Sequence, residues 1–153
     1  MKHKVKRDIG LPKKKKQPSH KTLKKLAWDA FSKFIRLRDC LKTTGTATHG
    51  KCITCGKLAP FGLLDAGHFV SRKYNSTLFD ETNCHAQCRF CNRYQNGNLL
   101  EYRRQIVKLY GEGYDVELED KATELKKVTP LDLIEIKEYY AKKFKKLKEK
   151  NEN

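Results

Sequence analysis

Two C-x-x-C pairs, separated by 32 residues, constrain the fold of this chain more than any other feature. The first pair is Cys52 and Cys55, with Gly56 directly after it, and the second is Cys88 and Cys91. Two intervening residues let one tight turn present both thiolates to a single ion, and zinc favours a tetrahedron of such ligands. The spacing therefore predicts a structural Zn(Cys)4 site. The βαβ pattern that accompanies a thioredoxin-like redox pair is missing.

The charge balance points to a polyanionic partner. The chain has 153 residues, a formal net charge of +16, and 38% hydrophobic residues, which suits one domain with a small core and tails. Nucleic acid is the simplest partner and acidic lipid is the alternative. No segment approaches the roughly 20 apolar residues of a membrane span, and the N-terminus lacks the apolar stretch of a signal peptide. We therefore expect an intracellular protein with reduced or metal-bound cysteines, in which Cys40 and Cys84 are small buried residues.

Charge runs and turn residues divide the chain into segments. We predict a disordered basic arm over 1–20, an N-terminal helix over 21–40, a core over 51–111, a helical segment over 112–148 and a tail over 149–153. The arm is either a phosphate contact or a solubility tail, because blocks of like charge rarely pack.

Helical periodicity sets the expected boundaries of the helices. Apolar residues recur at helical spacing from Thr22, the predicted N-cap, to about Arg38. A second helix is predicted over 99–110, and the acidic segment 114–126 is either helical or irregular. The T-P-L-D run beginning at Thr129 predicts another helix start, with a capping residue, a proline in the first turn and an acidic residue near the positive end.

Polar residues between and beside the cysteine pairs are candidates for chemistry. His68 follows a predicted strand and can be a general base, because neutral imidazole accepts a proton near pH 7. The Asn92 side chain, together with Asp65 or His85, can hold a hard divalent cation such as Mg²⁺ or Mn²⁺. Asn83 can pin a loop by bonding to backbone groups. Each also has a purely structural interpretation, as a core histidine, a helix cap or the end of a strand.

The choice between Asp65 and His85 depends on the shape of the strand. Asp65 lies three residues before His68, so the two side chains would point to opposite faces of a regular strand. A bend at Gly67 would bring them together. Without such a bend, His85 is the better partner for Asn92, and the sequence leaves this choice open.

In order and spacing, these residues resemble the zinc-bearing HNH endonucleases, also called ββα-metal or His-Me finger nucleases. More narrowly, the runs DAGHF, FDETNCHAQCRFCN and GNLLEYR are similar to the phage lambda NinG (Rap) recombination-protein family, from about Lys51 to Gly111. The resemblance implies an α+β fold in which zinc knuckles brace a small ββα-metal core and helices flank it. It also implies that His68 is the general base, Asn83 the central motif residue and Asn92 a metal ligand.

The same resemblance implies a nuclease that requires Mg²⁺ or Mn²⁺ and acts on branched recombination DNA such as Holliday junctions, in the cytoplasm of a phage-infected bacterial cell. The sequence departs from the family pattern in two places. Gly67 stands where many HNH enzymes have an acidic metal ligand. Leu78 stands where NinG-like sequences tend to have arginine, which removes one phosphate contact.

Basic and aromatic residues near the candidate site are predicted to contact nucleic acid. The basic candidates are Arg72, Lys73, Arg89, Arg93, Arg103 and Arg104. Tyr74 and Tyr94 either stack on unpaired bases or belong to the core. Selectivity for a branch would need two sites at a fixed spacing, and hence a homodimer. The alternatives to a nuclease are a zinc-dependent DNA- or RNA-binding module without catalysis and a ribosomal-type RNA-binding protein, neither of which needs His68 and Asn92.

Overall fold

Residues 17–152 are described by a computed structural model, and within them four α-helices surround two short antiparallel sheets. The elements are α1 (His20–Thr44), β1 (His49–Lys51), β2 (Leu58–Pro60), the 3-10 turn η1 (Phe61–Leu63), β3 (Leu64–His68), β4 (Cys84–Cys88), the π-helical turn η2 (Phe90–Tyr94), α2 (Leu99–Tyr110), α3 (Tyr114–Thr123) and α4 (Pro130–Glu152). The predicted α+β class is confirmed. None of these helices is both long and apolar enough to cross a membrane.

The first helix begins earlier and ends later than the sequence suggested. The Ser19 side chain is the N-cap and accepts a hydrogen bond from the Thr22 backbone N–H, so the prediction of Thr22 as the cap was wrong by three residues. The helix continues to Thr44, and in its last turn the hydroxyls of Thr43 and Thr44 bond back to carbonyls one turn earlier. Gly45 then ends it in the left-handed conformation. Residues 1–16 of the predicted basic arm lie outside the described residues.

The last helix begins where the sequence predicted. Thr129 Oγ1 accepts from the Asp132 backbone N–H, and the Asp132 carboxylate accepts from the Thr129 backbone N–H, which is a reciprocal cap. The helix runs to Glu152, so the separate tail predicted from residue 149 is helical as far as residue 152. The acidic segment before it forms α3 up to Thr123 and is irregular from there to Pro130.

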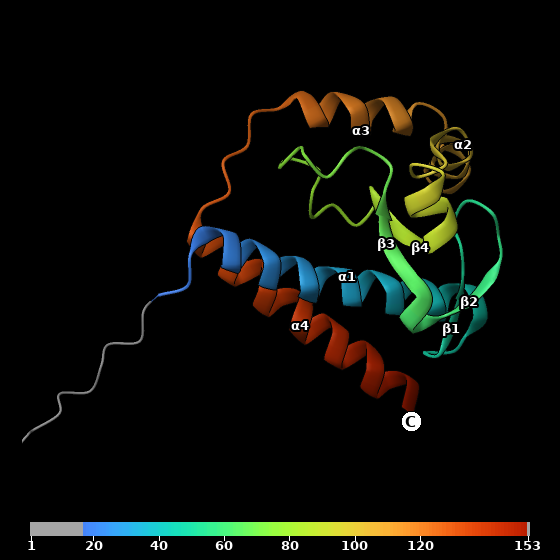
Figure 1. Cartoon of the computed structure of the whole chain (residues 1–153), viewed down its shortest axis with the longest axis horizontal. Helices are drawn as coiled ribbons and strands as arrows, with labels where there is room; N and C mark the ends of the chain where they lie inside the picture. The colour runs from blue at the N-terminus through green and yellow to red at the C-terminus, as the bar shows by residue number, and fades with distance from the viewer. Residues whose placement is uncertain (1–16, 153) are drawn as a thin grey trace, which may run out of the picture.

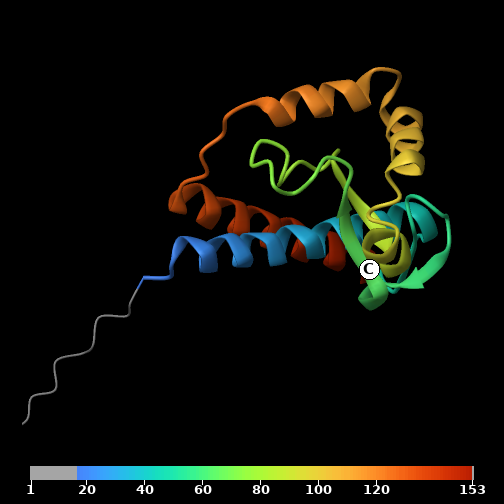
Figure 2. The same cartoon turned by 45° about the horizontal axis from the view of Figure 1, so that its top comes forward.

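Two long helices form the base of the molecule. α1 and α4 lie side by side in both views (Figures 1 and 2). Phe31 of α1 meets Tyr140 of α4 edge-to-face, with ring centroids 4.8 Å apart. Ala66 and Cys84 from the β3–β4 hairpin complete this buried cluster. Burying each large side chain contributes about 1.5–3 kcal/mol, so the contact stabilises both helices and fixes the hairpin on α1.

The register of the β3–β4 hairpin decides which side chains share a face. Gly67 pairs with His85, and Asp65 pairs with Gln87, so these four residues lie on one face. His68 belongs to the other face. The strand is regular from Leu64 to His68, so the bend at Gly67 that would unite Asp65 with His68 is absent from the hairpin.

A long loop, residues 69–83, joins the two strands and passes between the α1–α4 base and α3 (Figure 1). Tyr102 and Ile106 of α2 pack with Leu118 and Ala122 of α3 in a second buried cluster, which Phe69 of the loop also joins. This second cluster holds α2 and α3 on the hairpin side remote from α1.

Candidate metal sites and the arginine cleft

Four thiols converge at one end of the molecule. The Sγ atoms of Cys52, Cys55, Cys88 and Cys91 all lie within 4.8 Å of one another. Zinc–sulfur bonds of about 2.3 Å in a tetrahedron separate the sulfurs by about 3.8 Å, and Cys55 Sγ and Cys88 Sγ are 3.8 Å apart. The cluster could therefore hold a structural metal such as zinc, as the spacing predicted.

The sequence places these thiols on two knuckles. The first follows β1, where the Gly56 backbone N–H donates to the Cys52 carbonyl and Gly56 adopts a positive φ of 71°. The second spans the end of β4 and the start of η2. Burial opposes ionisation of the Cys52 thiol, but backbone N–H groups and the Thr54 hydroxyl lower its pKa to about 7. A low thiol pKa favours the thiolate that a metal binds. Burial and the neighbouring sulfurs raise the pKa of Cys55 to about 12 and also raise the pKa of Cys88, so further thiolates in the cluster need a cation to stabilise them.

The second knuckle leads directly into a polar contact between two predicted site residues. Asn92 Nδ2 donates to Asp65 Oδ2 at 2.9 Å, which joins η2 to β3. Arg93 binds the same carboxylate through two nitrogens, Nε at 2.7 Å and Nη2 at 2.8 Å. Partial burial opposes ionisation of Asp65, but these hydrogen bonds hold the pKa of its carboxyl below its usual range.

This contact lies in a cleft of about 340 Å³ between α1, β3 and η2. Four arginines line the cleft, namely Arg36, Arg72, Arg89 and Arg93, and Asp65 is the one acidic residue among its lining residues. We call this feature the arginine cleft. Its excess of guanidinium groups suits a phosphate-bearing ligand, because arginine binds phosphate bidentately.

Protein groups already orient three of these arginines. Arg36 donates to the carbonyls of Phe61 and Leu64. Arg89 donates to the carbonyl of Gly62 at 3.0 Å. The Arg72 guanidinium lies over the Trp28 ring, 4.7 Å from its centroid. The positive charges are therefore held at the cleft before any ligand arrives.

His68 lies beside the arginine cleft but on the other face of β3 from Asp65. Its ring stacks on Trp28, a lining residue of the cleft, with centroids 5.0 Å apart. Its Nε2 is 2.9 Å from the Leu78 carbonyl, which can only accept, so Nε2 carries the proton and Nδ1 keeps a lone pair. Burial lowers the pKa of His68 below 6.5, so its ring is neutral at pH 7. Within residues 17–152, no hydrogen bond joins His68 to Asp65 or Asn92.

The structure does not bring His85 to Asn92. His85 is buried, and its two ring nitrogens lie 3.2 Å from the Tyr102 hydroxyl and 2.8 Å from the Tyr110 hydroxyl of α2. Burial lowers its pKa to about 4. Of the two partners that the sequence left open for Asn92, Asp65 is the one in contact with it.

Asn83 holds the long loop, as its position predicted. Its Oδ1 accepts from the Val70 backbone N–H at 2.7 Å, and its Nδ2 donates to the carbonyls of Val70 and Thr77 at 3.0 and 3.1 Å. The side chain is fully buried. Asn83 is therefore a positioning residue for the segment that carries Arg72 and Leu78, the hydrogen-bond partner of His68.

Gly67 is required by close packing above its Cα atom. A Cβ at this position would lie 2.3 Å from Gln87 Oε1 and 3.2 Å from Asn92 Oδ1. Gln87 is fully buried, and its Nε2 donates to the Gly97 carbonyl and to Thr54. Its Oε1 is one of the few buried oxygens without a hydrogen-bond partner in the described part of the chain. The Gln87 and Asn92 side chains thus occupy the room that a side chain at position 67 would need.

The other three residues predicted to contact phosphate do not line the arginine cleft; they are Lys73, Arg103 and Arg104. Arg103 of α2 forms ion pairs with Asp115 and Glu119 of α3, which neutralises its charge. Arg104 pairs with Glu101 one turn away. The Lys73 ammonium lies over the ring of its neighbour Tyr74. The sequence could not reveal the pairings of Arg103, because the acids on α3 follow only after a chain reversal, whereas the Arg104–Glu101 pair is three residues apart on one helix.

Sequence reasoning missed the contribution of α1 to the cleft. Trp28, Ser32 and Arg36 all line it. Their spacing of four residues places them on one face of the helix, beside the buried stripe that contains Phe31 and Ile35. A tryptophan followed at helical spacing by serine and arginine was the available signal. It marks a face that is neither apolar core nor a uniformly charged surface.

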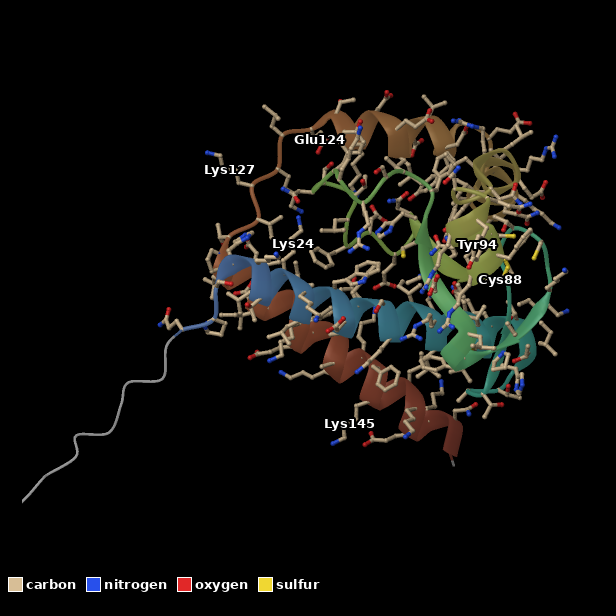
Figure 3. All side chains as sticks on the ribbon, viewed as in Figure 1. Lys24, Cys88, Tyr94, Glu124, Lys127 and Lys145 are labelled. Carbon is tan, nitrogen blue, oxygen red and sulfur yellow. The ribbon has the colours of Figure 1, made fainter. Side chains whose placement is uncertain are left out.

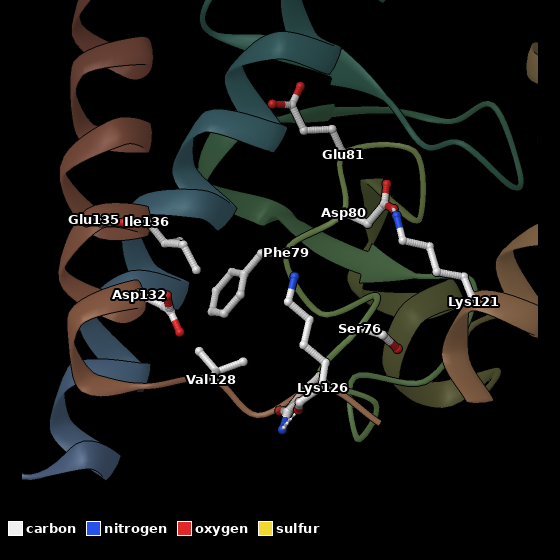
Figure 4. A pocket seen from close by; sticks show the side chains of 11 residues that line it. Ser76, Phe79, Asp80, Glu81, Lys121, Lys126, Val128, Asp132, Glu135 and Ile136 are labelled. Atoms are coloured by element: carbon white, nitrogen blue, oxygen red, sulfur yellow. Dashed lines mark hydrogen bonds and ion pairs between the residues drawn. The ribbon is translucent and has the colours of Figure 1, made fainter. Parts of the chain in front are cut away.

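A second cavity, of about 500 Å³, lies between the long loop, the segment before α4, and α4 itself (Figure 4). Three of its four acidic lining residues, all but Glu135, have partners within the described part of the chain. Asp80 binds Lys121 at 2.5 Å, Glu81 binds Lys143 at 2.6 Å, and Asp132 caps α4. The cavity therefore supports no catalytic assignment.

The fold and these sites define an α+β protein with a four-cysteine cluster that could hold a structural metal, beside a cleft lined by arginines. The chain belongs to the NinG family: the family model described as Bacteriophage Lambda NinG protein matches residues 1–152. No solved structure matches the chain.

Curated relatives support the same family. Protein ninG of Escherichia phage 933W is 36% identical over 96 residues, which are 62% of this chain and 43% of the relative. Protein ninG of Salmonella phage P22 is 38% identical over 88 residues, covering 57% and 39% of the two chains. Protein ninG of Escherichia phage lambda is 35% identical over 96 residues, covering 62% and 43%. The matched segment spans less than half the length of these relatives.

Proposed function

We propose that this protein is a metal-dependent DNA endonuclease of HNH type that acts on branched recombination intermediates such as Holliday junctions. The observation that carries the proposal is the contact between Asp65 and Asn92 inside the arginine cleft. A carboxylate and a carboxamide are the oxygen ligands that Mg²⁺ and Mn²⁺ prefer, and arginines around them suit a phosphodiester. The order of β3, β4 and η2 supports a ββα-metal core.

The donor set fits a hard divalent cation. Asp65 and Asn92 would hold it, with the Asn92 carboxamide turned so that Oδ1 faces the ion in place of the Nδ2 that now donates to the Asp65 carboxylate. Such a cation supplies stabilisation of negative charge on the phosphate and on the leaving oxygen. Arg93 must then leave the Asp65 carboxylate, which both of its bonding nitrogens now contact. The released guanidinium is free to bind a phosphate oxygen.

His68 is the proposed general base. Its Nε2–H bond to the Leu78 carbonyl fixes the tautomer that leaves Nδ1 able to take a proton from water. Trp28 stacks on one face of the ring, and burial lowers the pKa of His68, which keeps the ring neutral at pH 7. Arg72 bears a positive charge that disfavours protonation of the ring before a phosphate neutralises it. Phosphate binding at Arg72 would thus strengthen the base at the moment it is needed.

A four-way junction presents two equivalent strands to be cut. A homodimer of this chain, acting in the cytoplasm of the bacterial host, would hold two arginine clefts at a fixed spacing and so select a branch over a linear duplex. The net charge of +16 makes affinity for either DNA fall steeply with salt.

The divalent requirement tests the proposal. Cleavage of an end-labelled four-way junction is measured across a Mn²⁺ titration for wild type, Asp65→Ala and the control Glu117→Ala, which removes an exposed acid on α3. We expect cleavage by wild type and Glu117→Ala at the same half-maximal Mn²⁺ concentration. Asp65→Ala should lose cleavage or need at least tenfold more Mn²⁺. Equal cleavage by Asp65→Ala would contradict the assigned metal site.

A zinc-dependent DNA- or RNA-binding module without catalysis is the second candidate. The bidentate Arg93–Asp65 pair favours it, because Asp65 could serve only to orient an arginine toward phosphate. That function predicts tight junction binding with no cutting under Mg²⁺ or Mn²⁺.

A further inference from the structure

Two exposed aromatic rings lie on the short helix that carries Asn92. Phe90 and Tyr94 are four residues apart on η2, and their rings stack with centroids 6.2 Å apart at 28°. Tyr94 is 79% exposed and Phe90 59% exposed. Figure 3 shows Tyr94 close to Cys88, at the end of the molecule remote from the start of α1.

The turn that carries the two rings is held by neighbouring residues. Cys91 of η2 belongs to the four-cysteine cluster, and Asn92 and Arg93 bind Asp65 of β3. The turn that carries the rings is thus anchored to the cysteine cluster through Cys91 and to β3 through Asn92 and Arg93. A ligand that stacks on these rings therefore need not order the backbone of the turn, which lowers the entropy cost of binding.

The surroundings of the two rings are positively charged. The segment 88–100 contains Arg89 and Arg93, two lining residues of the arginine cleft, and has no Asp or Glu. A phosphate beside a stacked base could therefore bind Arg89, and it could bind Arg93 in competition with Asp65, which now pairs with that guanidinium. This combination of exposed rings and arginines is typical of surfaces that bind single-stranded nucleic acid.

We infer that Phe90 and Tyr94 form a stacking platform for an unpaired base of the DNA, with Tyr94 as the outer ring. The inference deepens the proposed function and rests on it for the identity of the ligand. Bases inside a duplex already stack on both faces, so an unpaired base at a branch or fork is the group that can use the platform. Residues 90 and 94 each lie two residues from Asn92, which puts the rings about one helix diameter, about 10 Å, from it.

A second copy of the chain is the rival occupant of this patch. Full exposure of Phe or Tyr corresponds to roughly 200 Å² each, so the two rings together offer roughly 280 Å². A stable protein interface buries about 800 Å² on each partner. Two rings flanked by arginines are too small a surface for that role, and their charge would oppose self-association.

Fluorescence of 2-aminopurine tests the platform directly. The base analogue is placed at the first unpaired position of a forked duplex, and the zinc-loaded protein is added without Mg²⁺, Mn²⁺ or chelator. We expect quenching by wild type and by Tyr94→Phe, which keeps the ring. Tyr94→Ala should lose the quenching and weaken fork binding about 5- to 150-fold, while binding to a fully paired duplex changes less than twofold. Tyr94→Leu should behave like the alanine variant, because apolar bulk alone does not stack.

Tyr139→Ala is the matched control, because it removes another exposed tyrosine from α4. It should leave the quenching and the fork affinity at wild-type values. Unchanged quenching in Tyr94→Ala would overturn the inference, as would a shift from dimer to monomer in Tyr94→Ala seen by sedimentation. Quenching by a wild type that cuts no DNA would support the platform and contradict the nuclease. Cleavage with an unaltered fork preference in Tyr94→Ala would contradict the platform alone.

Discussion

Replacing Asn83 with alanine measures how much the long loop depends on one side chain. Asn83 makes three hydrogen bonds to backbone groups of Val70 and Thr77 and is fully buried. Each bond contributes about 1 kcal/mol, and each buried group left without a partner costs about 1–3 kcal/mol, so Asn83→Ala should lower the free energy of unfolding by about 3–5 kcal/mol. For a domain of this length the melting temperature should fall by about 6 to 20 °C.

The assay is urea unfolding of the zinc-loaded protein at pH 7, followed by far-ultraviolet circular dichroism. Asn75→Ala is the control, because Asn75 forms hydrogen bonds with Lys24 and with the Lys126 carbonyl nearer the surface. This variant should lower the free energy of unfolding by less than about 1 kcal/mol. If Asn83→Ala also lost less than about 1 kcal/mol, the loop would be held by other contacts. The assignment of Asn83 as its anchor would then be wrong.

Three further predictions concern the close packing at Gly67, the buried His85 and the cysteine cluster. Gly67→Ala should destabilise the protein by about 1–3 kcal/mol in urea unfolding, because the added Cβ would lie 2.3 Å from Gln87 Oε1. Gly62→Ala is the control, because no atom beyond the neighbouring residues lies within 4 Å of the added Cβ, and it should change stability by less than about 0.5 kcal/mol. The pKa of His85 is about 4 in the folded protein. At pH values below the ordinary pKa of histidine, the unfolded chain therefore binds more protons than the folded protein does. The free energy of unfolding of the wild type should therefore fall by about 2 kcal/mol between pH 7 and pH 5. A His85→Gln variant should lack this fall, and equal falls in the two proteins would refute the prediction. Metal analysis of the purified protein should find one zinc per chain, and Cys88→Ser should lose both the zinc and the cooperative unfolding transition; full zinc content in this variant would contradict the cluster.

The features that sequence reasoning predicted best are those written in local spacing. The C-x-x-C pairs predicted the thiol cluster because two knuckles of that length present sulfurs to one point. The T-P-L-D run located the start of α4, because a cap depends on residues three apart. The start of α1 was misplaced since Ser19 and Thr22 are both good caps, and only their mutual hydrogen bonding selects Ser19.

The contacts between distant segments could not be predicted in the same way. Whether Asp65 or His85 meets Asn92 depends on the hairpin register and on α2, whose tyrosine hydroxyls surround His85. The contribution of Trp28 and Arg36 depends on how α1 crosses the hairpin, which no local pattern specifies. Likewise, the acidic partners of Arg103 are known only once α3 folds back on α2.

The measurement that tests the account most directly is cleavage of a labelled four-way junction and a matched linear duplex by wild type and His68→Ala, with Mg²⁺ or Mn²⁺ present. A general base contributes about 10²- to 10⁴-fold. We therefore expect wild type to cut the junction in preference to the duplex, and His68→Ala to bind the junction with unchanged affinity while cutting it at least about 100-fold more slowly. Tight binding by wild type without cutting under either metal would contradict the nuclease, and unaltered cutting by His68→Ala would remove His68 from its chemistry.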